Sequence, residues 1–386
     1  MKSIAGTVRH AGVFDETAVI AAGVQLREKL GANASCALAF VSSDYLPHLE
    51  DFTELIRVHG RIPELIGCTA NGLIAGPEEF EAGSGFVVLG FRFNEILANP
   101  YSFTRAQLES ADDGFWKESA GVQEPRAWLA LLNPVDLDVE EWLTEWNIDY
   151  PNVPCVGGFA SGTDAEGIAV FHNGVRVDGG ALIAFSGAVD AETVVSQGCR
   201  PIGEPLPVTR AEANVVYSLG SRPAYQALEA AYQTLADTEK AHARGNLFAG
   251  LASNEYVEDF KSGDFLVRNI IGADPETGAV VINGVPRVGQ TMQYQFRDRT
   301  LADADLRACI ATSIQPGSDA IAAIVFTCLG RGVKFFETEN HDAALIAAAV
   351  TPAPVAGFFC SAEIGPIAGI NSIHAYTASA LILRER

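Results

Sequence analysis

The sequence has few positive charges and no long apolar run. Its 26 Lys and Arg residues are outnumbered by 48 Asp and Glu residues, which gives a formal net charge of −22 at pH 7. A surface of this charge repels phosphate backbones and anionic lipid headgroups. No stretch reaches the roughly 18 uninterrupted apolar residues of a spanning helix, and the first residues lack the apolar segment of a signal peptide. We therefore expect a cytoplasmic protein with no nucleic acid or membrane partner.

Cysteine is scarce and shows no pairing pattern. The seven cysteines contain no CxxC pair, which argues against both a disulfide framework and a zinc ribbon. Cys68, Cys155, Cys328 and Cys360 stand at or beside glycine-flanked strand ends, where backbone amides could stabilise a thiolate. A hydrolase with a cysteine nucleophile is therefore one hypothesis, although the sequence does not place a histidine base beside any thiol.

The seven histidines are isolated from one another. No HxH or HExxH pattern is present, so the sequence predicts no metal site. A single axial histidine is enough to bind haem, and this keeps haem possible as a cofactor. His374, in "NSIHAYTASALIL", is more typical of a strand residue than of a ligand.

Short β-branched and aromatic runs outnumber amphipathic helical segments. Asn173-Gly174 predicts a tight hairpin turn, and "NIIGADPETGAVVING" predicts a second hairpin with a longer loop. These patterns indicate a mixed α+β fold in the α/β class, with largely antiparallel or mixed sheets flanked by helices. The length favours two domains, which we place at 1–205 and 206–386 because Pro, Gly and charge accumulate near that boundary. The helices are expected at 15–30, 139–146, 223–235, 301–312 and 342–350.

Three apolar segments end in similar glycine-rich stretches. They are "PELIGCTANGLIAG" (63–76), "VPCVGGFASGTDAEG" (153–167) and "PVAGFFCSAEIGPIAG" (354–369). Glycine there would let backbone N–H groups approach a small ligand, or it would serve tight turns and close strand packing. The first stretch has Leu73 and Ile74 where a Walker loop carries Lys and Ser/Thr, so nucleotide hydrolysis is rejected.

Two arginines interrupt apolar strand signals. Arg268, in "DFLVRNIIG", and Arg331, in "CLGRG", each need a partner anion or a route to water. Each could bind a ligand carboxylate or form an ion pair with Glu363 or Asp264. The sequence leaves both alternatives open.

Several separate motifs together resemble the FIST family. "LIGCTANGLIAG", "CVGGFASG" and "FHNGVRVDGGALIAF" resemble its N-terminal domain, and "DFLVRNIIGADPETGAVVINGVPRVGQTMQYQFRD", "IVFTCLGRGVKFF" and "VAGFFCSAEIGPI" resemble its C-terminal domain. The family's C-terminal motif usually reads Gly-Glu-Ile-Gly, whereas Ala362 precedes Glu363 here. The resemblance covers nearly the whole chain in the right order.

The resemblance implies a non-enzymatic cytoplasmic sensor of an amino acid or similar metabolite. Histidine kinases, cyclic-nucleotide enzymes and chemotaxis receptors are the implied partners, and a haem-based nitric-oxide sensor is the alternative. Since we expect no fused output domain, a separate partner would read the signal. We expect strand ends from both domains to close around the ligand, with an arginine on its carboxylate and Glu363 on its ammonium group. The expected ligand-binding residues are Cys68, Gly157, Gly158, Arg268, Cys328, Arg331, Glu363 and His374.

Overall fold

The chain folds into two compact units. A computed structural model describes residues 2–31, 34–135, 137–257, 259–261, 263–315 and 319–386. Unit 1 contains residues 1–195 and 307–386, and unit 2 contains residues 196–306. The expected mixed α+β class is confirmed, because helices accompany mixed and antiparallel sheets. The domain boundary near residue 205 stays a prediction. It divides the sequence into two consecutive domains, whereas unit 1 is built from two separate stretches of the chain.

The first sheet of unit 1 has one parallel pair of strands among antiparallel neighbours. Its strands are β1 (Ile4–Ala11), β6 (Gly85–Arg92), β2 (Cys36–Val41), β3 (Leu65–Thr69), β10 (Val170–His172) and β11 (Val175–Val177), in spatial order. Strands β2 and β3 run parallel, while β6 and β10 flank them in the antiparallel direction. The accompanying helices are α1 (Glu16–Leu30), η1 (Ser43–His48) and α2 (Leu49–Gly60).

The second and third sheets repeat this strand order. The second contains β7 (Ile96–Phe103), β12 (Gly180–Gly187), β8 (Ala127–Leu132), β9 (Cys155–Phe159), β24 (Glu363–Ile367) and β25 (Ile370–His374). The third contains β13 (Val189–Ser196), β26 (Ala378–Glu385), β22 (Ala320–Cys328), β23 (Val355–Cys360), β4 (Leu73–Ala75) and β5 (Glu78–Phe80). The pairs β8–β9 and β22–β23 are parallel, as β2–β3 is. Their helices are α3 (Arg105–Glu109), α4 (Phe115–Ala120), α5 (Val139–Asp149), α9 (Val333–Phe336) and α10 (His341–Val350), and α8 (Arg299–Ser313) includes residues of both units.

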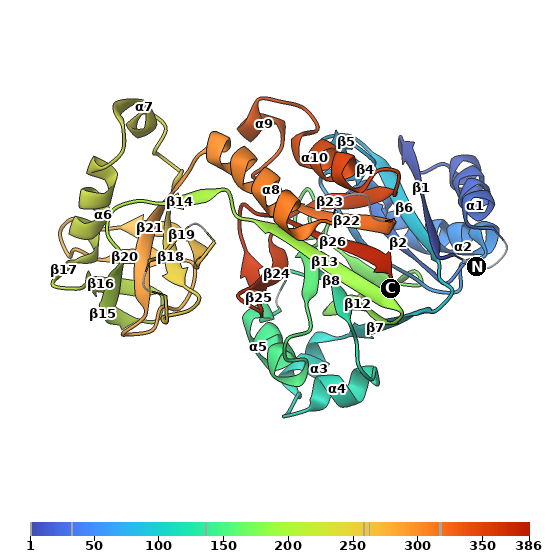
Figure 1. Cartoon of the computed structure of the whole chain (residues 1–386). Helices are drawn as coiled ribbons and strands as arrows, with labels where there is room; N and C mark the ends of the chain where they lie inside the picture. The colour runs from blue at the N-terminus through green and yellow to red at the C-terminus, as the bar shows by residue number, and fades with distance from the viewer. Residues whose placement is uncertain (1, 32–33, 136, 258, 262, 316–318) are drawn as a thin grey trace. The chain divides into compact units, whose positions relative to one another are not determined.

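Unit 1 is therefore a threefold internal repeat whose members exchange hairpins. The repeats begin at β1, β7 and β13, and unit 2 is inserted into the third repeat after β13. The hairpin that follows β3 (β4–β5) pairs with β23 of the third repeat, as Figure 1 shows. The hairpin after β9 (β10–β11) pairs with β3, and the hairpin after β23 (β24–β25) pairs with β9. Each repeat thus completes the sheet of another.

The three glycine-rich segments occupy equivalent positions in this repeat. Gly67, Gly157 and Gly357 each lie in the second strand of a parallel pair, opposite Ala39, Ala130 and Val325. A Cβ at these glycines would lie 2.2, 2.0 and 1.9 Å from the carbonyl oxygen of the opposite residue. Such distances are far below van der Waals contact, so close strand packing excludes any side chain at these positions. The similarity seen in the sequence reflects this shared packing role.

The three sheets of unit 1 enclose one apolar core. Alternate residues of the central strands, such as Leu38, Leu129 and Ile324, belong to that core and are fully buried. The opposite face of the first sheet packs against α1 and α2, and that of the second packs against the tryptophan-rich α4 and α5. Because successive side chains of a strand point to opposite faces, one face of each strand lies in the shared core and the other lies under helices.

Unit 2 is an antiparallel barrel with a helix packed on its core. Strands β21, β15, β16, β20, β19 and β18 pair in sequence, and β18 pairs back with β21 to close the ring. Helix α6 contributes three buried alanines to its core. The bounds are β14 (Cys199–Pro201), β15 (Leu206–Glu212), β16 (Val215–Leu219), β17 (Arg222–Pro223), α6 (Ala224–Gln233), α7 (Asp237–Lys240), β18 (Leu247–Ala252), β19 (Phe265–Ala273), β20 (Val280–Ile282) and β21 (Thr291–Arg297).

Most expected elements are present. The hairpin at Asn173-Gly174 is confirmed, with φ values of 50° and 86°, and the β19–β20 hairpin is confirmed as well. All five expected helices are found within a few residues of their predicted bounds. Helix α2 was not predicted, although Leu49, Phe52 and Ile56 bury one face at helical spacing. Within the described ranges, no helix is both long enough and apolar enough to cross a membrane.

Candidate functional site

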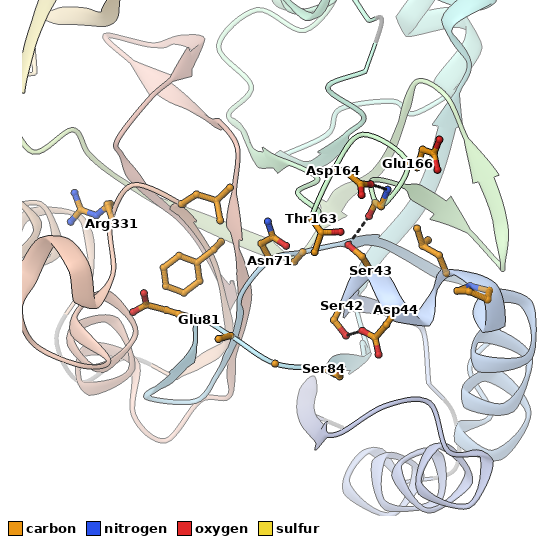
Figure 2. Close-up of a pocket in the computed structure, with 18 of the residues that line it drawn as sticks. Ser42, Ser43, Asp44, Asn71, Glu81, Ser84, Thr163, Asp164, Glu166 and Arg331 are labelled. Atoms are coloured by element: carbon orange, nitrogen blue, oxygen red, sulfur yellow. Dashed lines mark hydrogen bonds between the residues drawn. The ribbon is translucent and has the colours of Figure 1, made fainter. Parts of the chain in front are cut away.

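A cavity of about 990 Å³ lies in unit 1. It is found where the parallel strands β2, β3, β22 and β23 end, and residues from all three repeats line it (Figure 2). The carboxyl ends of parallel strands are a common place for ligand sites in open sheets. The lining residues are Ser42, Ser43, Asp44, Leu46, Pro47, Ala70, Asn71, Glu81, Ala82, Gly83, Ser84, Thr163, Asp164, Glu166, Gly167, Arg176, Leu329, Arg331, Lys334 and Phe359.

The segment after β2 supplies hydroxyl and carboxylate groups to one wall. Ser42 Oγ donates to Asp44 Oδ1 at 2.5 Å. Ser43 Oγ donates to the carbonyl of Gly167 at 2.8 Å, which ties this wall to the loop after β9 (Figure 2). On that loop Asp164 Oδ1 accepts the amide of Gly167 at 2.8 Å. These bonds fix polar groups from two repeats around the same space.

Asn71, in the loop after β3, is linked to the loop after β9 and through it to the end of β23. Its backbone N–H donates to Ser161 Oγ at 2.9 Å, and its side-chain amide donates to the Gly162 carbonyl at 2.6 Å. Ser161 Oγ in turn donates to the Phe359 carbonyl at 2.6 Å. The three repeats therefore meet in one hydrogen-bond network beside the cavity, and this network holds Asn71 and Phe359 in its lining.

Arg331 forms a buried ion pair with Asp342, which was not one of the predicted partners. Its Nε and Nη2 atoms donate to Asp342 Oδ2 and Oδ1 at 2.6 and 2.9 Å, and both side chains are at most 1% exposed. The guanidinium also lies over the ring of Phe336, 5.0 Å from its centroid. Burial opposes the charge on Asp342, but Arg331, His341 and Thr327 more than offset it, and the pKa of Asp342 falls well below its usual range. The charge of Arg331 is thus largely neutralised within the protein.

The β4–β5 hairpin and the segment before α9 complete the cavity wall. Glu81 Oε1 accepts the amide of Val333 at 2.6 Å, and the carboxylate packs against Gly332, which has a φ of 81°. The exposed Lys334 lies on the same wall. Four carboxylates, five hydroxyl or amide side chains and three basic side chains line the cavity in all. Such a lining suits a ligand with several polar groups.

The predicted ligand-binding residues do not converge on this cavity. Of the eight, Arg331 alone belongs to the described lining. Arg268 lies in β19 of unit 2, where it donates to the carbonyl of its neighbour Val267 at 3.3 Å. Gly158 lies opposite Glu363 and packs against Cys360, and a Cβ there would lie 2.7 Å from the sulfur. Their roles in ligand binding remain predictions.

Glu363 and His374 are paired residues on neighbouring strands of the second sheet. Both side chains are buried, and Glu363 Oε2 accepts the amide of Thr377 at 3.1 Å. Burial raises the pKa of Glu363 well above its usual range, although the Thr377 amide, the Cys328 thiol and the Arg331 charge oppose this effect. His374 Nε2 donates to the Gly365 carbonyl at 3.0 Å. This arrangement favours a neutral, buried Glu363 rather than a carboxylate ready to bind an ammonium group.

The cysteines are held in environments that oppose nucleophilic reactivity. Cys68, Cys155, Cys328 and Cys360 are all buried. Burial raises the pKa of the Cys68 and Cys155 thiols, and burial together with nearby Glu363 raises that of Cys360. A catalytic thiol needs the opposite shift. The geometry therefore gives the cysteine-hydrolase hypothesis no support.

The cavity also lacks the side chains that bind haem iron. None of the described residues that line it is His, Cys, Met or Tyr, the usual axial ligands of haem. The residues therefore do not fit a haem group in this cavity. No group of three or more metal-binding side chains is found among the described residues either.

The sequence analysis missed most residues of the cavity. The segments 42–47, which includes most of η1, and 81–84 carry no conspicuous motif, and segment 163–167 was noted only as the end of a glycine-rich stretch. One signal was available for Asp342, an acidic residue at the start of an otherwise apolar helical segment. Such a residue needs a buried partner.

Two family models and several relatives match this chain. The model of the FIST N domain matches residues 35–222, and that of the FIST C domain matches residues 224–366. "Uncharacterized protein Mb0898c" of Mycobacterium bovis is 34% identical over 371 residues, which cover 94% of each chain. "Uncharacterized protein MT0656" of Mycobacterium tuberculosis is 32% identical over 393 residues, which cover 93% of this chain and 94% of the relative.

Proposed function

This chain belongs to the FIST family, and from that premise we propose that it is a cytoplasmic sensor that binds one small polar metabolite in the cavity of unit 1. FIST domains are sensory domains that bind small ligands in signalling. An amino acid or a similar metabolite is the proposed ligand, and a separate partner protein reads its binding. The single observation that carries the proposal is the cavity, because its polar lining comes from all three repeats.

The charges of the lining support a ligand that carries both signs. Asp44 and Asp164 each accept a hydrogen bond through Oδ1, and either carboxylate can also bind an ammonium group of the ligand. Lys334 and Arg176 are both exposed at the cavity, so either can take a carboxylate. Arg331 is less suited to that task than we expected, because Asp342 already occupies two of its nitrogen donors.

Binding at this place offers a route to a signal. A ligand that contacts all three repeats favours the arrangement in which their loops close around it, and a partner can distinguish that arrangement from an open one. The hydrogen bonds of Ser43 and Asn71 already connect the loops of different repeats.

Thermal unfolding of the full-length protein with a panel of amino acids and related polar metabolites tests the proposal. We expect at least one compound to raise the unfolding temperature and to bind saturably in calorimetry, with one site per chain. Ala82→Trp, at an exposed position of the lining, should abolish this shift by filling the cavity. Ala106→Trp, on the surface of α3, is the matched control and should keep it. Equal shifts in both variants would contradict the proposed site.

A further inference from the structure

Two glutamates fasten the β4–β5 hairpin to the third repeat. Glu79 and Glu81 are two positions apart along the hairpin, and both reach the segment that runs from Arg331 to α10. Glu79 Oε1 accepts the amide of Ala343, in the first turn of α10, at 2.8 Å. Glu81 Oε1 accepts the amide of Val333 at 2.6 Å. In addition the backbone N–H of Glu79 donates to Asn340 Oδ1 at 2.7 Å.

The charged groups that act on Glu79 are mostly carboxylates. Asp342 on α10 and Glu81 on the same hairpin both oppose its ionisation, while the backbone amides of α10 favour it. Arg331 and His341 both contact Asp342, and Lys334 of the same segment is exposed. Glu78, the other acid of β5, pairs with Arg9 of β1 at 2.7 Å. The Oε2 atom of Glu79 is buried, and it accepts no hydrogen bond from the described residues.

We propose that the β4–β5 hairpin is a proton-controlled latch, in which ionisation of Glu79 loosens the attachment of segment 331–343 to the hairpin. That segment carries Arg331, Val333 and Lys334, so the latch sets how firmly one wall of the cavity is held. The inference concerns the protein without ligand, and it stands or falls independently of the proposed function.

The direction of the effect follows from the state of the Glu79 carboxyl. Burial, together with the charges of Asp342 and Glu81, raises the pKa of Glu79 to about 7. A carboxyl with a raised pKa holds its proton more tightly in the closed latch than in an open one. The closed latch is therefore most stable below the ordinary pKa of glutamate, weakens as the pH rises through the interval up to about 7, and changes little above it. At neutral pH the latch is thus close to the end of its transition.

Amide hydrogen exchange measures the latch directly. The amides of Ala343 and Val333 are the donors to Glu79 and Glu81, so their protection reports on the two attachments separately. We would follow both amides in the full-length protein from about pH 5 to about pH 8, corrected for the intrinsic pH dependence of exchange. Glu79→Gln removes the titrating group, and Glu78→Gln is the control on the same strand.

The expected result is a concerted loss of protection. In the wild type and in Glu78→Gln, protection of both amides should fall about tenfold or more across this range. In Glu79→Gln it should stay constant. A fall at Ala343 without one at Val333 would overturn the latch, because only the Glu79 hydrogen bond would then respond. A wild type without pH dependence would overturn it as well.

A direct titration of Glu79 covers the case in which Glu79→Gln does not fold. Carbon-detected NMR of the wild-type side-chain carboxyl should give a midpoint near 7. A midpoint at the ordinary value for glutamate would overturn the proposal, since the carboxyl would then remain ionised throughout the range in which the latch is expected to loosen.

Discussion

Arg331 and Asp342 hold each other through two parallel hydrogen bonds in the interior of unit 1. The distances are 2.6 and 2.9 Å, and neither side chain is more than 1% exposed. Thr327 and His341 also donate to Asp342, so that its carboxylate is fully engaged. This pair fixes the loop after β22 to the start of α10.

Removal of the Asp342 carboxylate should therefore lower the free energy of unfolding. Asp342→Ala leaves the guanidinium of Arg331 buried without its counter-ion, and we expect a loss of about 3 to 5 kcal/mol in the free energy of unfolding. Urea denaturation measures this change. Asp319→Ala, which breaks the surface pair with Lys2, is the control and should have little effect. Equal losses in the two variants would show that the buried pair has no special role.

The threefold repeat predicts that substitution of any of three distant glycines destabilises the protein to a similar extent. Alanine at Gly67, Gly157 or Gly357 would force a Cβ against the opposite backbone carbonyl. Each substitution should lower the free energy of unfolding by about 3 kcal/mol or more, since backbone cannot yield as a side chain can. Gly272→Ala is the control, because the nearest atom to a Cβ there is 4.0 Å away. A mild effect at one of the three glycines would contradict their equivalence.

The accessibility of the thiols tests the hypothesis of a hydrolase with a cysteine nucleophile against that of a sensor. Six of the seven cysteines are buried, and Cys309 is partly exposed. A thiol reagent such as dithionitrobenzoate should modify Cys309 rapidly in the native protein and the other six only on unfolding. Cys309→Ser should remove the rapid phase. A second rapidly reacting thiol would reopen the question of a nucleophile.

Glu363 should make stability fall as the pH rises. Its pKa in the folded protein is raised well above the usual range, so the folded state binds the proton more tightly than the unfolded chain. Its contribution is fully present below the ordinary pKa of glutamate and is lost as the pH rises toward the raised value. Glu363→Gln should flatten this dependence in urea titrations between about pH 5 and pH 8. If the variant keeps the wild-type slope, Glu363 is ionised in the folded protein.

The sequence predicted local features better than long-range partners. The Asn173-Gly174 turn and the glycine-rich strand ends depend on residues close together in the chain, and both were visible. Asp342 was not identified as the partner of Arg331, because the loop after β22 and the helix α10 that carry them meet only after folding. Most of the residues that line the cavity were not identified either. The cavity depends on Ser43 and Gly167, which are 124 positions apart and come together through the exchange of β10 and β11.

The exchange of hairpins has a consequence for how the chain is made. Strand β4 leaves the ribosome early, yet its partner β23 follows about 280 residues later, after the whole of unit 2. The hairpin of the first repeat therefore cannot complete the third sheet until the third repeat has been synthesised. In a solenoid each repeat needs only the next one, and such a protein tolerates shortening. Here each repeat depends on a hairpin from another repeat, and the third repeat is the last to be made. A chain that stops before β23 leaves the β4–β5 hairpin without its partner strand.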